Sequence, residues 1–267
     1  MSSLRDSIKA EAHGKGLSTV NLMLEQKFNK LFFLKPNSEE ESKLIYNLLT
    51  KNGFNAERAG LHASAIIVGE GDFCYREQVL SLLYKRIQSS NIPSGLKRIF
   101  EEGNYIHEKW QRLFIRGELG AARDMDRSRF NKRYELSYTP DAIIDFMGEQ
   151  QVVEIKSMNT FQFKHCTSHP SGKKQLMMYM HLTGIHKGFV LVEDKNTQDF
   201  KIFMQKYDAT EVEDYVERLE AIRFYKRRVL EEGKMVKGIC SSRDCKRAQK
   251  CDMRDACFNC GVGRIKL

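Results

Sequence analysis

Apolar and polar residues alternate through the middle of the chain in the way that predicts three successive strands. The first two are expected at Arg133–Tyr138 and Ala142–Met147, and a glycine turn separates them from a third that contains Val153–Lys156. Side chains alternate between the two faces along a strand. The valine and isoleucine of this run would therefore point into the core, while Glu154 and Lys156 would share the opposite face.

The same pattern predicts helices on either side of these strands. Apolar residues recur at helical spacing in four stretches, about 72–89, 96–116, 174–180 and 210–232. Two further strands, Gly188–Glu193 and Phe200–Gln205, would pair across a polar turn. Residues 1–60 look mostly helical. The predicted class is α/β, with a mixed sheet flanked by helices. A loop is expected over Asn159–Gly172, which either only connects its neighbours or stacks its aromatic residues on single-stranded bases.

Two acidic residues and a lysine are the first candidate chemistry. Asp141 follows Pro140 at the start of the second strand, and the hairpin would bring it beside Glu154. Paired carboxylates can hold a hard divalent cation, and Lys156 could orient or activate a water beside that cation. The alternative is an ordinary hairpin with exposed charges.

Two helical motifs add to this picture. Gln175 and Tyr179 are four residues apart, so both would project from one face of a helix. The plain alternative is the polar edge of an amphipathic helix. His107 follows Gly103 by one helical turn, and this glycine would allow close approach. An isolated helical histidine is otherwise a structural residue, but imidazole also suits manganese and mixed-ligand sites.

Together these motifs resemble the PD-(D/E)xK nuclease superfamily and its RecB-like branch. The resemblance implies a restriction-endonuclease-like mixed sheet and hydrolysis of DNA that depends on Mg²⁺ or Mn²⁺. It implies that the metal is held by His107, Asp141, Glu154 and the carbonyl of Ile155. Lys156 would act on the attacking water, and Gln175 and Tyr179 would orient the substrate. In this branch the histidine accompanies exonucleases.

The cysteines form a second candidate site. Five of the seven lie near the C-terminus, at Cys240, Cys245, Cys251, Cys257 and Cys260. The N-terminus is polar and charged, so we expect no signal peptide and a cytoplasmic location, in a bacterial or phage-infected cell. Disulfides are disfavoured there, which makes a metal site the better interpretation of the cluster.

One early cysteine and a late cluster resemble the iron–sulfur nucleases among the CRISPR-associated RecB-like exonucleases. The resemblance implies a [4Fe–4S] cluster held by Cys74, Cys245, Cys251 and Cys257, with Cys240 as a substitute ligand. The spacing departs from the usual tail of that group. The alternative is a local structural Zn²⁺ held by Cys240, Cys245, Cys251 and Cys257.

Charge supports a polyanionic partner. The 44 basic residues exceed the 35 acidic residues, which gives a net charge of +9 and an isoelectric point near 9.1. No apolar run is long enough to cross a membrane. We expect DNA as the partner, single-stranded or at its ends, with a recombination or replication protein as a possible second partner.

The function predicted from these observations is a metal-dependent DNA nuclease in repair, recombination or phage DNA processing. Two alternatives belong to other classes: a non-cleaving DNA-binding or recombination accessory protein with a structural metal site, and a zinc-stabilised interaction module. The expected division of the chain is a helical segment at 1–60, a nuclease core at 61–236 and a cysteine-rich metal-binding tail at 237–267.

Overall fold

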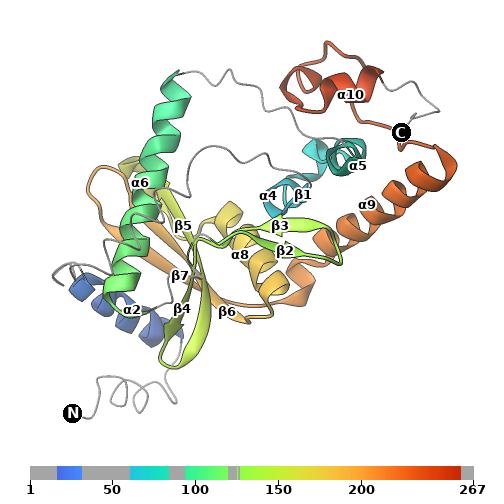
Figure 1. Ribbon diagram of the computed structural model, residues 1–267. Coiled ribbons are helices and arrows are strands. Elements are labelled where there is room, and N and C mark those ends of the chain that lie inside the picture. Colours follow the sequence, from blue (N-terminus) through green and yellow to red (C-terminus); the bar gives the residue numbers. More distant parts are fainter. Residues whose placement is uncertain (1–16, 32–60, 84–93, 120–124, 126, 260–267) are drawn as a thin grey trace. The chain divides into compact units, whose positions relative to one another are not determined.

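The computed structural model describes residues 17–31, 61–83, 94–119, 125 and 127–259 (Figure 1). These form two compact units, each assembled from separate stretches of the chain. The first draws on 1–53, 94–128 and 139–209, and the second on 54–93, 129–138 and 210–267. No described helix is both long enough and apolar enough to cross a membrane. Of the predicted helical segment 1–60, only residues 17–31 are described, and the rest lies outside the described residues.

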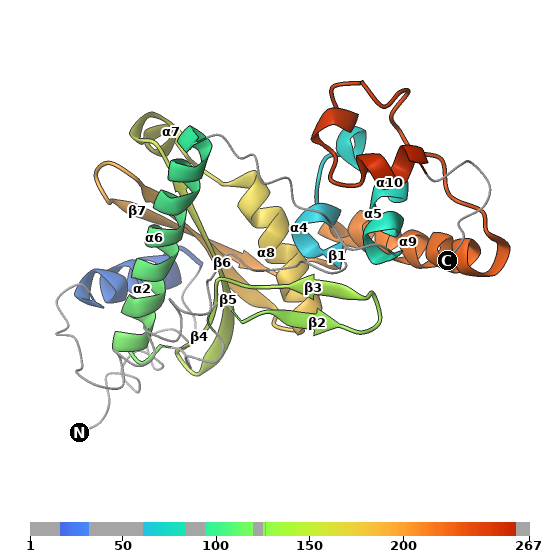
Figure 2. The same cartoon turned by 45° about the horizontal axis from the view of Figure 1, so that its top comes forward.

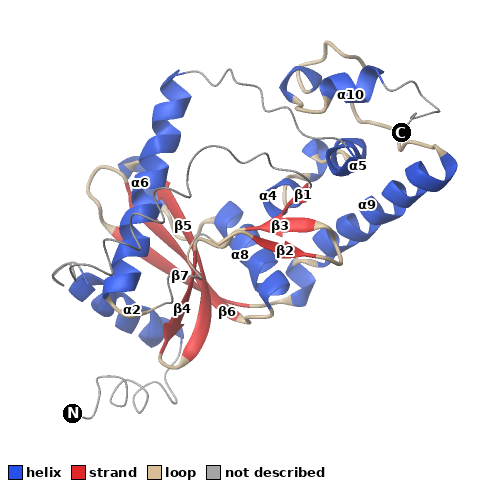
Figure 3. Cartoon of the chain, in the orientation of Figure 1, coloured by secondary structure: helices blue, strands red, loops and turns tan. Residues whose placement is uncertain are grey.

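A four-stranded mixed sheet is the centre of the first unit (Figure 3). Its order is β4-β5-β6-β7, with β4 (Ala142–Phe146) antiparallel to β5 (Glu149–Met158) and β6 (Lys187–Asp194) parallel to β5. β7 (Phe200–Lys206) completes the sheet antiparallel to β6. A mixed sheet flanked by helices is the predicted fold class, which the structure confirms.

Helices cover both faces of this sheet. The core beneath α2 (Leu17–Leu31) and α6 (Ser94–Arg116) contains Val153 and Ile155 of β5, as the alternating pattern predicts. α8 (Pro170–Thr183) packs against β5 and β6. Figures 1 and 2 show α6 and α8 on either side of the strands. Glu154 and Lys156 alternate with the core residues and therefore point to the face opposite that core.

An aromatic cluster joins the two helices of the first face. Phe28 of α2 has its ring centroid 5.7 Å from that of Trp110 and 5.3 Å from that of Phe114, both in α6. Trp110 meets Phe200 of β7 edge to face at 4.9 Å. Aromatic pairs at such distances add stabilisation beyond the area they bury. This packing fixes α6 over the sheet.

The second unit contains a small three-stranded sheet in the order β1-β3-β2. β1 (Leu61–His62) runs parallel and β2 (Arg129–Asn131) antiparallel to β3 (Leu136–Tyr138). The short helix α4 (Ala63–Ile66) follows β1. α5 (Tyr75–Leu83) packs against α9 (Glu213–Glu232) and against α10 (Arg254–Asn259). Short 3₁₀ helices occur at Glu70–Asp72 and Ala248–Lys250 in this unit, and a third occurs at Ala209–Glu211.

Two predicted elements differ from the structure. Of the expected strand Arg133–Tyr138, only Leu136–Tyr138 is a strand (β3). The residues before it form a tight turn, because the side chain of Asn131 accepts a hydrogen bond from the Tyr134 amide (3.2 Å) and Glu135 has a positive φ of 50°. The expected loop Asn159–Gly172 contains a helix, α7 (Thr160–His165). Asn159 caps its first turn, and Pro170 begins α8 at the position where proline suits a helix.

Candidate active site

Asp141 lies immediately before β4. The first residue of β4, Ala142, pairs with Val153, so the Ile155 amide, two residues further along β5, lies beyond the residues that pair with β4. The Asp141 Oδ2 atom accepts a hydrogen bond of 2.6 Å from the Ile155 amide. The side chain thus replaces the missing strand and is itself held against β5. Asp141 is 9% exposed.

Glu154 and Lys156 lie side by side on the same face of β5. The Lys156 Nζ atom is 2.5 Å from Glu154 Oε1. It also donates to the Gln175 side-chain oxygen of α8 at 3.2 Å, and Gln175 in turn donates to the Tyr179 hydroxyl at 2.9 Å. Gln175 and Tyr179, which are four residues apart on α8, are therefore connected to Lys156 by hydrogen bonds. Tyr179 is buried, with 1% exposure.

His107 approaches from α6. Its Nδ1 atom is 3.1 Å from Asp141 Oδ1, so both oxygens of this carboxylate have a partner. One turn later, the Gln111 side chain donates to the Asp141 carbonyl at 2.9 Å. Beyond its chain neighbours and the backbone of its own helix, no described atom lies within 4 Å of a Cβ added at Gly103, so the expected close approach at this glycine is wrong.

Glu193 anchors α6 to β6 and was not identified from the sequence. This carboxylate is 1% exposed and accepts hydrogen bonds of 2.6 Å from both Lys109 Nζ and Trp110 Nε1. The two donors follow His107 by two and three residues. They set the position of the helix that carries the imidazole. Nothing in the local sequence distinguishes Glu193 from any polar residue at the end of a strand.

Burial and mutual charge shift the pKa values of these groups in different directions. Burial and the neighbouring Asp141 raise the pKa of Glu154 to about 8. Burial alone would raise the pKa of Asp141, but His107 and the Ile155 amide outweigh it and lower that pKa. Burial disfavours the imidazolium, yet Asp141 keeps the pKa of His107 above its usual value. The pKa of Lys156 is raised because Glu154 outweighs its burial.

The donor chemistry of this site suits a divalent cation. Glu154 Oε2 is buried and has no hydrogen-bond partner among the described residues. An unpartnered buried oxygen is costly, and a cation beside it would remove the cost. Within the described chain, no three His, Cys, Asp or Glu side chains converge in a metal-binding arrangement. His107 and Lys156 instead occupy the carboxylate oxygens nearest to them.

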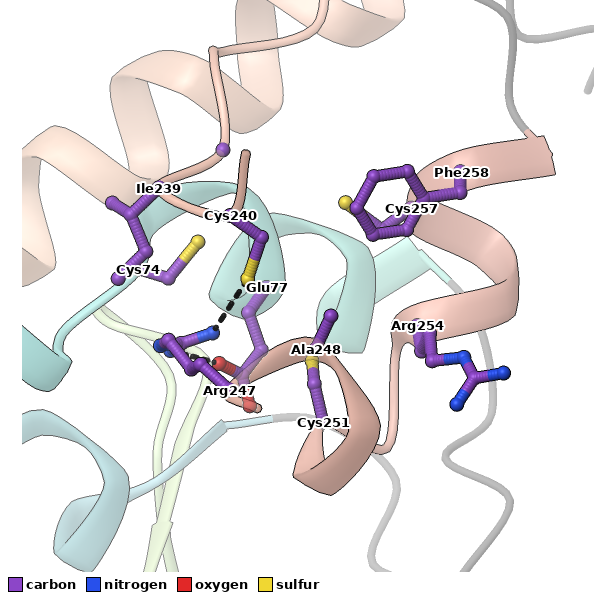
Figure 4. A pocket seen from close by; sticks show the side chains of 11 residues that line it. Cys74, Glu77, Ile239, Cys240, Arg247, Ala248, Cys251, Arg254, Cys257 and Phe258 are labelled. Atoms are coloured by element: carbon purple, nitrogen blue, oxygen red, sulfur yellow. Dashed lines mark hydrogen bonds and ion pairs between the residues drawn. The ribbon is translucent and has the colours of Figure 1, made fainter. Parts of the chain in front are cut away.

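Four cysteines gather around a pocket in the second unit (Figure 4). They are Cys74, Cys240, Cys251 and Cys257. Cys74 immediately precedes α5, Cys240 and Cys251 lie between α9 and α10, and Cys257 lies in α10. Cys245 does not line the pocket; its sulfur accepts a hydrogen bond from the Ala248 amide at 3.4 Å. Cys260 lies outside the described residues.

Arginine side chains organise the pocket from two sides. Arg247 donates to Cys240 Sγ at 3.7 Å and to Glu77 Oε2 of α5 at 2.8 Å. Arg76, 7% exposed, donates to the Cys257 carbonyl at 2.7 Å. Burial raises the pKa of Cys240, and it raises the pKa of Cys251 to about 11. These thiols are therefore protonated at neutral pH unless a metal takes the place of their protons.

Comparison with known proteins gives structural likeness only. No model of a protein family and no curated protein sequence matches the chain. Among solved structures, it is similar to LHK-Exo in complex with dAMP, at 17% identity over 68% of this chain and 98% of that one, with a TM-score of 0.46. A second structure of LHK-Exo, an alkaline exonuclease from Laribacter hongkongensis, gives 19% identity over 67% and 97%, with a TM-score of 0.45. This likeness in fold does not assign an activity, because activity resides in the residues of a site rather than in a fold.

Proposed function

We propose that this chain is a metal-dependent deoxyribonuclease, an exonuclease in mode. The observation that carries the proposal is Glu154: a buried carboxylate with an unpartnered oxygen, next to Asp141 and within 2.5 Å of a lysine. A protein that only binds DNA gains nothing from such a group, because it raises the cost of folding. A cation held there would polarise a phosphoryl oxygen and stabilise the leaving oxygen.

The residues divide into ligands and positioning groups. His107, Asp141, Glu154 and the Ile155 carbonyl are the proposed ligands of Mg²⁺ or Mn²⁺. Lys156 would orient the attacking water, and its charge would stabilise the developing negative charge. Gln175 accepts from the lysine and keeps its ammonium group directed at this water. Tyr179 holds Gln175 through its hydroxyl.

DNA is the proposed substrate because the chain is strongly basic, with a net charge of +9. Its phosphodiester groups match the chemistry of paired carboxylates and a lysine. The proposed setting is the cytoplasm of a bacterial or phage-infected cell, in DNA repair, recombination or phage DNA processing. The reduced cysteines fit this compartment.

The cysteine pocket is proposed as a structural metal site. Cys74, Cys240, Cys251 and Cys257 would hold a [4Fe–4S] cluster, and structural Zn²⁺ is the alternative. The supporting observation is that four cysteines from two distant parts of the chain, none of them in a disulfide, line one pocket. A metal there would fasten the C-terminal segment to α5. Visible absorption and metal analysis of anaerobically purified protein distinguish the two metals.

A nuclease assay with matched lysine variants tests the proposed function. Lys156→Ala should lower the rate of DNA cleavage by about 100-fold or more, the size of effect typical for a group acting on the attacking water. Lys187→Ala is the control, since this lysine is 45% exposed in a surface ion pair with Glu149. Equal cleavage by both variants would refute the proposal. Binding of DNA without cleavage by the wild type would favour a non-cleaving accessory protein.

A further inference from the structure

The stretch of chain from Glu154 on β5 to Glu193 on β6 has an unusual charge distribution. Between Glu154 and Glu193 the sequence contains no acidic residue, but it contains five lysines and four histidines. This stretch includes α7, the whole of α8 and most of β6. A Cβ atom added at Gly172 of α8 would lie 2.9 Å from His169 Nδ1 and 3.3 Å from Lys156 Cγ, so this part of α8 lies close to Lys156. The basic segment therefore borders the proposed active site.

Phe161 is exposed on this segment. Its side chain is 76% exposed, the most of any large hydrophobic residue in the described chain. It lies five residues after Lys156, in the first turn of α7, where Figure 2 shows the helix beyond the end of β5. His165 packs edge-on against the ring at a centroid distance of 5.2 Å. Most of the ring surface is left open to solvent.

The helix that carries Phe161 is anchored at both ends. A six-residue helix is not stable alone in water, so tertiary contacts must hold it. At its start, the Thr160 hydroxyl donates to Asp194 Oδ1 at 3.0 Å. At its end, Lys201 Nζ donates to the carbonyls of Phe163 and Cys166 at 2.6 and 3.1 Å, and Phe163 is buried. The exposed ring thus projects from a fixed base.

We propose that Phe161 stacks on an unpaired nucleobase next to the scissile phosphate, which makes single-stranded DNA the substrate of this site. The inference rests on the proposed nuclease function and names its substrate class. Lys164, Lys173 and Lys174 lie on the same basic segment and neutralise the phosphates of the strand. A paired base has both faces covered by its neighbours, so duplex DNA offers no free face to this ring.

Binding in EDTA tests this proposal without requiring cleavage. Phe161→Ala should weaken binding of single-stranded DNA about tenfold, which is within the usual contribution of one stacked base. Binding of duplex DNA of the same sequence should be unchanged. Phe161→Trp should restore single-strand affinity, and its new exposed fluorophore should be quenched by bound DNA, whereas the single native tryptophan, Trp110, is buried. Phe224→Ala, which removes another exposed ring (48%), is the matched control.

Unchanged single-strand affinity in Phe161→Ala, or equal loss for single-stranded and duplex DNA, would overturn the proposal. Restored affinity in Phe161→Trp without quenching would also contradict it. Failure of the nuclease proposal has a different signature. In that case the Phe161 effects would persist in binding while the wild-type protein left DNA intact in Mn²⁺.

Discussion

Glu154 and Glu193 are equally buried, at 1% exposure, on the neighbouring parallel strands β5 and β6. Glu193 accepts two hydrogen bonds of 2.6 Å, from Lys109 and Trp110. Glu154 forms an ion pair with Lys156, and its Oε2 atom has no hydrogen-bond partner in the described chain. The carboxylate of Glu193 therefore stabilises the fold, whereas burial of the Glu154 carboxylate costs folding free energy that a bound cation can offset.

Glu154→Gln should therefore stabilise the metal-free protein at neutral and alkaline pH. The pKa of Glu154 is about 8 in the folded protein, against 4.5 without its environment. Below pH 4.5 both states hold the proton, so variant and wild type should unfold alike. As the pH rises toward 8, the unfolded wild type releases a proton that the folded form retains, and stability is lost. We expect a gain in Tm on the order of 5 °C at pH 8 in EDTA, measured by calorimetry.

Glu193→Gln is the matched control for this experiment. This substitution removes the negative charge to which Lys109 and Trp110 of α6 donate hydrogen bonds. We expect it to lower the free energy of unfolding by about 2 kcal/mol at pH 7. A lower Tm in both variants at pH 8 would contradict the contrast drawn between the two carboxylates.

Two glycines should respond in opposite directions to alanine. At Gly188 in β6, an added Cβ would press against the Val152 carbonyl oxygen and lie 3.0 Å from Leu176 Cδ1. Gly188→Ala should lower the free energy of unfolding by several kcal/mol, because the backbones of β5 and β6 cannot move apart at this point without breaking the pairing between the two strands. Gly103→Ala should stabilise α6 by about 0.5–1 kcal/mol, since the position is open. Urea denaturation measures both, and a destabilised Gly103→Ala variant would show that this glycine is needed after all.

The local pattern of the sequence was enough to predict much of the fold and the neighbourhood of the site. Period-two alternation placed Val153 and Ile155 in the core and Glu154 beside Lys156. The contacts of Glu193 join residues 83 and 84 positions apart, and no local pattern encodes them. The turn at Asn131 was missed because one side-chain hydrogen bond decided it against strand propensity.

The cysteine pocket shows the same limit. The predicted [4Fe–4S] set used Cys245, with Cys240 only as a substitute, whereas the structure places Cys240 on the pocket and Cys245 off it. The intervening chain is irregular, so linear spacing does not translate into distance. The sulfur atoms of the four lining cysteines face the pocket in Figure 4.

Serine substitution at these two cysteines should separate their roles. Cys240→Ser should lower the metal content of purified protein and reduce its Tm, because metal-binding free energy contributes to folding. Cys245→Ser should retain the metal, since Cys245 is not among the residues that line the pocket and its sulfur accepts a hydrogen bond from the Ala248 amide. Elemental analysis and visible absorption measure both. Loss of metal in Cys245→Ser with full retention in Cys240→Ser would reverse the assignment.

The most direct test of the central claim is cleavage of end-labelled single-stranded DNA by wild-type protein and Glu154→Gln, each with Mn²⁺ and with EDTA. If Glu154 belongs to a metal-dependent nuclease site, the wild type should cut only with the metal, and the variant, although correctly folded, should not cut. Wild-type cleavage in EDTA, or metal-dependent cleavage that persists in Glu154→Gln, would contradict it.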